Sequence, residues 1–167
     1  VDLSERMKAD STFNESDYVA AFFDQVKDGN GKIFGIPAYG TTQVLYYNIK
    51  AFEDAGIDPQ SIKTWQDLGD AAAKIKDGGN YTYGWEPMWG ADNLIDAAFS
   101  NGGSIFSKDG KNVTINSKEW VEVWEAFRTW IHEDKTMAIH SGGQGWEYWY
   151  NTIDDVLQNT AGGYTGS

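Results

Sequence analysis

Residues 85–89 combine two kinds of side chain that can bind a carbohydrate. The segment reads Trp85-Glu86-Pro87-Met88-Trp89 and follows residues that alternate in the manner of a β-strand. Flat aromatic rings stack on the C–H faces of sugar rings, and carboxylates accept hydrogen bonds from hydroxyl groups. Trp85, Glu86 and Trp89 are therefore candidate ligand contacts. The alternative interpretation of the same residues is a buried tryptophan pair beside a surface glutamate.

The segment 142–150 is the second candidate. A glycine-rich stretch leads into Trp146-Glu147-Tyr148-Trp149-Tyr150, in which four of the five residues are aromatic. A small domain can hardly bury such a run whole, and exposed apolar patches often mark binding sites. Trp146, Glu147 and Trp149 are therefore candidate contacts. The alternative is a helix start that packs its aromatic side chains against a sheet.

A polar break at residues 38–43 supplies the third group. It separates two strand-like runs, residues 31–37 and 44–48. Pro37 ends the first run, because proline cannot donate a hydrogen bond to a central sheet ladder. A chain that crosses between two lobes has this organisation, and ligands are bound between lobes. Tyr39 and Thr41 are candidate contacts at this crossing, and ordinary exposed surface is the alternative.

The elements that must position these residues alternate along the chain. Apolar spacing indicates helices within the ranges 18–26, 49–55, 64–77, 92–99 and 117–131, with a short helix that ends near residue 158. Strands are indicated at 32–37, 43–48, 81–85, 161–167 and, as a hairpin, 104–106 with 112–115. This order predicts an α/β fold in which helices flank a mixed sheet. Thr64 and Asp67 predict a capping box, and Trp120, Trp124 and Trp130 fall on one helix face that is assigned to the core.

The charge balance argues against two classes of partner. The net charge is −12, and the 13 Lys and Arg residues are scattered rather than clustered. A nucleic-acid backbone and an anionic membrane surface both require a basic face, so neither is an expected partner. No run approaches the ~20 apolar residues of a membrane span. The chain has no cysteine, which excludes disulfides, zinc-thiolate sites and thiol catalysis.

Two patterns imitate chemistry that the chain is not expected to perform. Residues 28–33 resemble the middle of an EF-hand loop, but Val26 would occupy the first ligand position and Pro37 that of the bidentate glutamate. Glu86 and Glu147 could suggest the carboxylate pair of a glycosidase, but 25 acidic residues make some such pair inevitable. No nucleophile elbow, phosphate-binding loop or zinc-protease motif occurs. No metal site, cofactor or enzymatic activity is therefore predicted.

An ordered series of short motifs resembles a known family. The motifs are Gly31-Lys32-Ile33-Phe34-Gly35-Ile36-Pro37, Tyr47-Asn48, Phe52, Ala55-Gly56 and Thr64-Trp65-Gln66-Asp67-Leu68. Together they resemble the carbohydrate-binding, maltose-binding-protein-like family of bacterial extracellular solute-binding proteins, which serve ABC importers. The resemblance implies a periplasmic-binding-protein-like fold of type II, with two α/β lobes and a sugar in the cleft. It further implies a monomer that docks on ABC permease subunits, in the periplasm or lipid-anchored at the extracellular face, without inserting this segment into the membrane.

The resemblance also implies that this chain is a fragment. Residues 1–37 would be the tail of the N-terminal lobe, 38–43 the hinge crossing, 44–160 most of the C-terminal lobe, and 161–167 the start of the return crossing. The expected function is capture of a sugar, an oligosaccharide given the eight tryptophans, by closure of the lobes. Two alternatives stay open: a secreted glycan-active enzyme or carbohydrate-binding module, and a solute-binding protein for a non-sugar ligand such as a polyamine.

Overall fold

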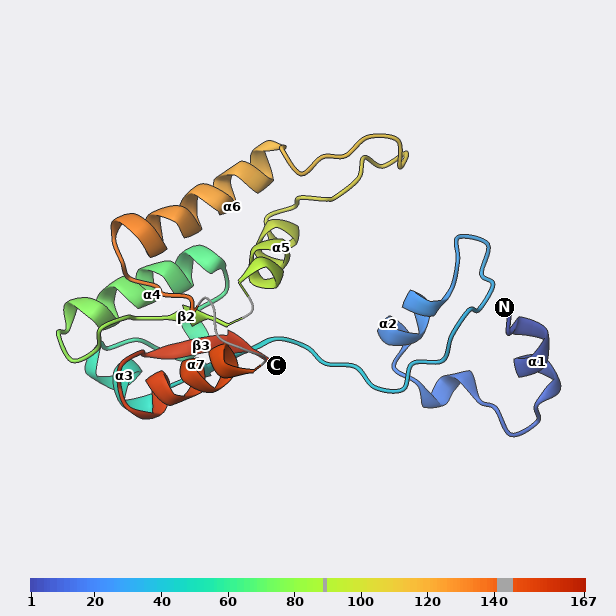
Figure 1. The fold of residues 1–167 in the computed structure, drawn as a ribbon, viewed down its shortest axis with the longest axis horizontal. Helices are drawn as coiled ribbons and strands as arrows, with labels where there is room; N and C mark the ends of the chain where they lie inside the picture. Colours follow the sequence, from blue (N-terminus) through green and yellow to red (C-terminus); the bar gives the residue numbers. More distant parts are fainter. Residues whose placement is uncertain (89, 141–145) are drawn as a thin grey trace. The chain divides into compact units, whose positions relative to one another are not determined.

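The structure, a computed structural model, describes residues 1–88, 90–140 and 146–167. The chain divides into two compact units, Val1–Thr42 and Gln43–Ser167 (Figure 1). The boundary between the units falls inside the polar segment 38–43, which has no regular secondary structure. Each unit has its own buried core.

The first unit consists of short helical turns around a small core. Its elements are α1 (Ser4–Ala9), η1 (Glu15–Asp17), α2 (Ala20–Phe23) and η2 (Asp24–Val26). Met7, Phe23 and Ile33 are its buried residues, with partly buried apolar side chains around them. The Asp28 carboxylate accepts hydrogen bonds from the backbone N–H groups of Asn30 and Lys32. That carboxylate therefore closes a turn in the segment that resembles an EF-hand loop.

Two predictions for the first unit need correction. The strand expected at 32–37 is reduced to a single bridge between Lys27 and Ile33. The helix expected within 18–26 begins only at Ala20, because Val19 has an extended backbone (φ −66°, ψ 118°), and it continues from Asp24 as the 3₁₀ turn η2. Val19 consequently stays exposed.

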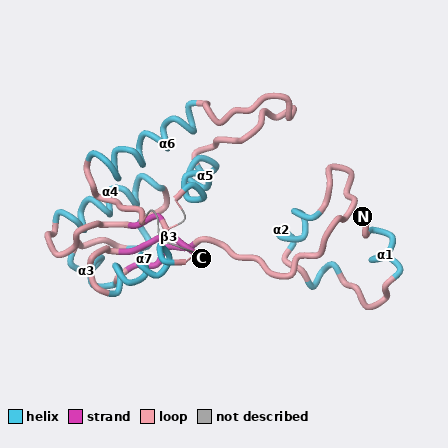
Figure 2. The backbone as a smooth tube through the Cα atoms, in the orientation of Figure 1, coloured by secondary structure: helices cyan, strands magenta, loops and turns pink. Residues whose placement is uncertain are grey.

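A three-stranded mixed sheet lies at the centre of the second unit (Figure 2). Its strands are β1 (Val44–Tyr47), β2 (Glu86–Pro87) and β3 (Gly163–Gly166), in the order β1-β3-β2. β1 pairs with β3 in antiparallel fashion, and β2 pairs with β3 in parallel. Tyr46 faces Tyr164 across the antiparallel pair, and their rings stack with centroids 4.7 Å apart. The predicted mixed sheet with flanking helices is confirmed.

The helices of this unit follow the predicted order. They are α3 (Ile49–Asp54), η3 (Pro59–Ser61), α4 (Trp65–Asp77), α5 (Ala91–Ser100), α6 (Lys118–Arg128), the π-helical turn η4 (Thr129–Glu133) and α7 (Glu147–Leu157). The predicted capping box of α4 is present: Thr64 Oγ1 accepts from the Asp67 N–H, and the Asp67 carboxylate accepts from the Thr64 N–H. Within the described residues, no helix is both long and apolar enough to cross a bilayer.

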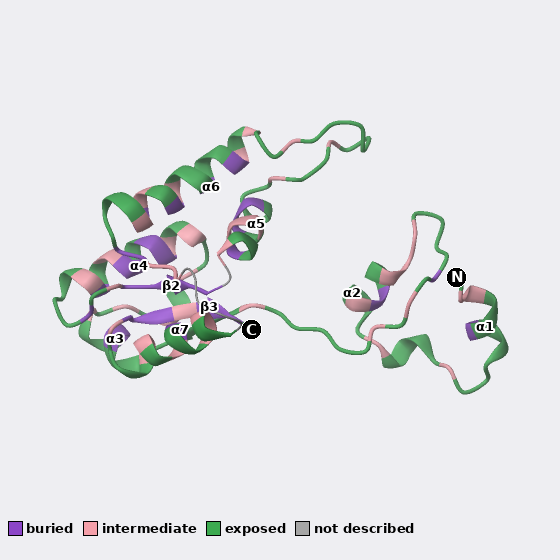
Figure 3. Cartoon of the chain, viewed as in Figure 1, coloured by how far each residue is buried: buried purple, intermediate pink, exposed green. Residues whose placement is uncertain are grey.

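The core of the second unit gathers around Trp85, which is fully buried. Phe52 of α3, Leu68 and Ile75 of α4, and Trp130 of η4 belong to the same cluster. Figure 3 shows these buried positions in purple on α4 and along β2 and β3. The core therefore joins the helices to the residue that directly precedes β2.

Gly69 of α4 lies directly against the ring of Trp130, which belongs to η4. A Cβ added at Gly69 of α4 would lie 2.4 Å from the ring of Trp130. The indole therefore occupies the space that a side chain at position 69 would need. A glycine inside a helix costs about 1 kcal/mol relative to alanine, so this contact explains why α4 tolerates one.

Three further predictions are corrected in the second unit. Glu86 and Pro87 were expected to break a strand, but they form β2; Pro87 is tolerated because β2 lies at an edge of the sheet. The hairpin expected over 104–115 is reduced to one bridge, between Phe106 and Val113. Trp124 is 53% exposed, because the buried stripe of α6 and η4 runs through neighbouring positions. That stripe consists of Trp120, Val123, Phe127 and Trp130.

Candidate functional site

Trp85 is a core residue in this structure. Its side chain is fully buried, and its indole Nε1–H donates a 2.8 Å hydrogen bond to Thr165 Oγ1 of β3. Its ring also makes an edge contact with Phe52 at 6.3 Å between centroids. A ring held in this way offers no face to a ligand, so Trp85 is reassigned from ligand contact to core. Trp89, its predicted partner, lies outside the described residues.

Glu86 is buried beside Trp85, contrary to the surface glutamate of the alternative interpretation. It lies on β2 and is 1% exposed. Neither of its carboxylate oxygens has a hydrogen-bond partner among the described residues. Burial, with a further contribution from the charge of Asp155, raises the pKa of Glu86 to about 9. At neutral pH without any bound cation this carboxyl is therefore protonated.

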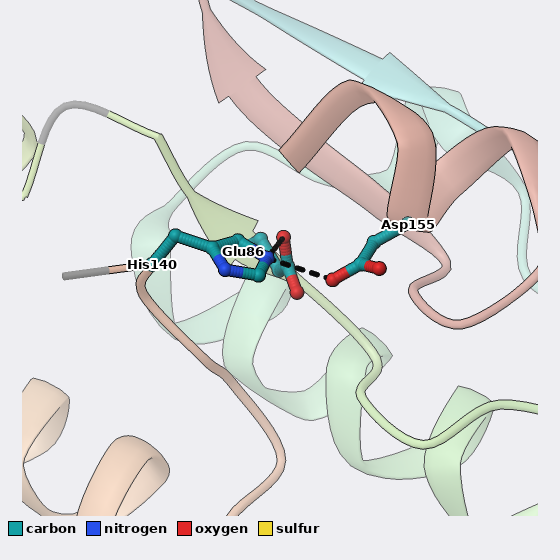
Figure 4. A group of neighbouring side chains, drawn as sticks. All are labelled: Glu86, His140 and Asp155. Carbon is teal, nitrogen blue, oxygen red and sulfur yellow. Dashed lines mark hydrogen bonds and ion pairs between the residues drawn. The ribbon is translucent and has the colours of Figure 1, made fainter. Parts of the chain in front are cut away.

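His140 and Asp155 complete a cluster around Glu86 (Figure 4). His140 Nε2 lies 2.7 Å from Asp155 Oδ2 and 3.6 Å from Glu86 Oε2. The backbone brings His140 to this place, because Met137 forms a parallel bridge with Trp85 and Ala138 N–H donates to the Trp85 carbonyl. Asp155 comes from the last turns of α7, which packs on β3.

Sequence reasoning did not find this cluster. Glu86, His140 and Asp155 belong to a strand, a loop and a helix that are distant in the chain. No spacing rule joins such positions, and only the pairing of Trp85 with Met137 sets their register. The carboxyl that Glu86 meets is Asp155 of α7 rather than Glu147, the partner weighed for a glycosidase.

The start of α7 carries exposed aromatic rings. Trp146 and Trp149 contact each other edge to face at 6.3 Å between centroids, and Trp149 contacts Tyr150 in the same way at 5.0 Å. Trp146 is 61% exposed, Tyr150 is 60% exposed and Trp149 is partly exposed. We call these three residues the α7 aromatic surface. Glu147, also exposed, lies among them in the first turn of the helix.

Three predicted contacts, Trp146, Glu147 and Trp149, therefore lie together at the N-terminal end of α7. Tyr39 and Thr41 are exposed in the first unit, and Tyr39 is 88% exposed. Because the two units are described separately, no site is built from both.

An open apolar hollow of about 660 Å³ lies elsewhere in the second unit. Among its lining residues are Leu45 of β1, Trp65 of α4, Ala97 of α5 and Phe127 of α6. Gln43, the last residue of the predicted crossing at 38–43, also lines this hollow. The hollow adds a concave apolar surface that the sequence did not indicate.

Comparison with known proteins places this geometry in context. The family model described as bacterial extracellular solute-binding protein matches residues 2–167. The periplasmic sn-glycerol-3-phosphate-binding protein UgpB of Escherichia coli K12 is 44% identical over 79 residues, which are 44% of this chain and 18% of that protein. The chain therefore spans less than a fifth of this curated relative.

Solved structures resemble nearly the whole chain. The ABC substrate-binding protein Lmo0181 of Listeria monocytogenes, solved with cycloalternan, gives a TM-score of 0.78 at 27% identity over 99% of this chain and 42% of that protein. UgpB of Mycobacterium tuberculosis, solved with glycerophosphocholine, gives a TM-score of 0.74 at 16% identity, over 99% of this chain and 41% of that protein. These neighbours confirm the periplasmic-binding-protein-like fold of type II. They also confirm that the chain corresponds to a part of a longer architecture.

Proposed function

Because the chain belongs to the family of bacterial extracellular solute-binding proteins, we propose that the protein containing it captures a solute for an ABC importer. Proteins of this kind are non-enzymatic components of transport, located in the periplasm or at the extracellular face. Docking on permease subunits, a monomeric state and a lipid anchor are parts of the same proposal. Within it, residues 1–37 and 44–160 belong to two lobes, and 38–43 is the hinge.

The ligand that we propose is a neutral sugar, and the α7 aromatic surface is the observation that carries it. Two exposed rings and the partly exposed ring of Trp149 between them meet at angles of 76° and 74°, so they offer more than one platform for sugar C–H faces. Such adjacent platforms suit an oligosaccharide better than a single ring. The complex of the Listeria protein with cycloalternan is in keeping with this choice.

A phosphate-bearing ligand is the second candidate, because the E. coli and mycobacterial relatives are named for glycerophosphate compounds. Recognition of a phosphate uses arginine, lysine or free backbone N–H groups. The acidic Glu147 lies within the aromatic segment, and the chain carries a net charge of −12. The local charge therefore favours an uncharged polyol over an anion.

Ligand binding between two lobes would favour their closed arrangement by differential affinity. In that arrangement the α7 aromatic surface forms part of one wall of the cleft. We propose Tyr39 and Thr41, which belong to the crossing segment, and Trp89 as further contacts. Glu147 accepts hydrogen bonds from ligand hydroxyl groups.

The test is calorimetry on the full-length protein with neutral oligosaccharides, sn-glycerol 3-phosphate and glycerophosphocholine. Trp146→Ala and Trp149→Ala should each weaken oligosaccharide binding by about 2- to 10-fold, the worth of one aromatic stacking contact. Trp124→Ala is the matched control, because Trp124 is an exposed tryptophan on α6. Equal effects of all three substitutions would refute the assignment of the α7 aromatic surface. Product formation from the glycans would instead favour the glycan-active enzyme.

A further inference from the structure

The carboxylate of Glu86, a predicted ligand contact, lies outside the α7 aromatic surface on which the proposed capture of a sugar depends. It is 1% exposed, and neither oxygen has a hydrogen-bond partner among the described residues. Buried polar groups in native proteins are nearly always paired, because an unpaired one loses its hydration without compensation. The position therefore has room for a partner that the side chains of the described residues do not supply.

The atoms that surround Glu86 are ligands of metal ions. Glu86, His140 and Asp155 each offer one such atom, and the three atoms all lie within 4.8 Å of one another. Figure 4 shows the three side chains converging from β2, from the segment that follows Met137, and from α7. We propose that Glu86, His140 and Asp155 bind a divalent transition-metal ion of the Zn²⁺ type.

The spacing of the ligand atoms suits this ion. Zinc binds histidine nitrogen and carboxylate oxygen at about 2.0–2.2 Å in tetrahedral geometry, which puts neighbouring ligand atoms about 3.3 Å apart. His140 Nε2 lies 2.7 Å from Asp155 Oδ2 and 3.6 Å from Glu86 Oε2. These distances lie on either side of the tetrahedral value. To bind the ion, the first pair of atoms must separate and the second must approach, starting from three atoms that all lie within 4.8 Å of one another.

The donor set selects the class of metal. One imidazole with two carboxylates suits zinc and neighbouring transition metals. Calcium takes six to eight oxygen ligands, and three side chains of which one is an imidazole do not provide them. His140 and Asp155 are 33% and 24% exposed at their side chains, so water reaches the fourth position.

Binding of the ion changes the charge of a buried site. A dication balances the two carboxylates of Glu86 and Asp155, of which that of Glu86 is almost completely buried. The ion also connects β2 with α7, the helix that carries the α7 aromatic surface. The metal site does not depend on the proposed sugar ligand, so the two proposals can be tested and refuted independently.

The experiment is calorimetric titration of the metal-stripped 167-residue chain with ZnCl₂, with CaCl₂ as comparator. We expect saturable binding of one Zn²⁺ per chain and no comparable binding of Ca²⁺. Glu86→Gln and Asp155→Asn should weaken zinc binding by about tenfold or more, and His140→Gln should abolish it. His132→Gln is the matched control, because His132 is the other histidine of the chain and should leave the affinity unchanged.

Glu86→Gln keeps the shape of the buried side chain, so this variant should fold. Its circular dichroism without metal should equal that of the unchanged chain. Nitrogen-15 NMR provides a second readout, since zinc should shift Nε2 of His140 and not the ring nitrogens of His132. Zinc affinity that survives His140→Gln, or is lost in His132→Gln, would overturn the proposal. So would the absence of saturable zinc binding to the unchanged chain.

Discussion

Removing the hydrogen bond between Trp85 and Thr165 is the most stringent test of the conclusion that Trp85 is a core residue. Thr165→Val keeps the shape of the side chain but removes the acceptor of the 2.8 Å bond from Trp85 Nε1. Trp85 is fully buried and Thr165 is 4% exposed, so water cannot replace the lost partner. An unpaired buried donor costs about 1–3 kcal/mol. With a urea dependence of about 2 kcal/mol/M, a loss of about 2 kcal/mol lowers the unfolding midpoint by about 1 M.

All eight tryptophans of the chain lie in the second unit, so tryptophan fluorescence during urea unfolding reports on that unit alone. Thr165→Ser is the control, since it keeps the hydroxyl and loses a methyl group at a cost of about 1 kcal/mol. In a double-mutant cycle, Trp85→Phe removes the donor, so Thr165→Val should then cost much less. If Thr165→Val costs the same with Trp85 as with Phe at position 85, the hydrogen bond does not stabilise the core.

The remaining predictions concern packing, acid stability and binding. Gly84→Ala should destabilise the second unit by about 3 kcal/mol or more, because the new Cβ would lie 1.9 Å from the carbonyl oxygen of Ala72. Urea unfolding measures the effect, and Gly29→Ala is the control, because a Cβ at position 29 meets no atom within 4 Å. Hydrogen bonds, the largest from the Lys63 N–H, lower the pKa of Asp67. The stabilising effect of the Asp67 carboxylate is therefore complete above its pKa in the unfolded chain, and it is lost as the pH falls through its lower pKa in the folded chain. The difference in melting temperature between the unchanged chain and Asp67→Asn should consequently become smaller as the pH is lowered. The isolated 167-residue chain should bind oligosaccharides weakly or not at all in calorimetry, since it supplies mainly one wall of the proposed cleft; millimolar or tighter binding would contradict this.

Local rules predicted the helices well. The capping box at Thr64 and Asp67 involves atoms only three residues apart, so the sequence contains the whole interaction. The same holds for the buried stripe of α6, although Trp124 shows that the edge of a stripe depends on what packs there. Helix identity follows from such short-range patterns.

The sheet and the candidate site depend on contacts between residues that are distant in the sequence, and local sequence patterns do not reveal such contacts. Glu86 and Pro87 have the composition of a break, and they form β2 only because β3 lies beside them. The predicted contacts Trp146, Glu147 and Trp149 come together because they are neighbours on one helix. The cluster of Glu86 with His140 and Asp155 could not be predicted, since three separate elements must dock before the residues meet.

Because Gly69 and Trp130 are in direct contact, substitutions at these two positions should be coupled during evolution. Because the indole fills the space above Gly69, a larger residue at position 69 is acceptable only after the ring has become smaller. A smaller residue at position 130 in turn leaves a void that a side chain at position 69 can fill. Related sequences should therefore change the two positions jointly, glycine with a large ring or a larger residue with a small one. If position 69 changes first, the intermediate protein has a steric clash. If position 130 changes first, the intermediate protein has a cavity.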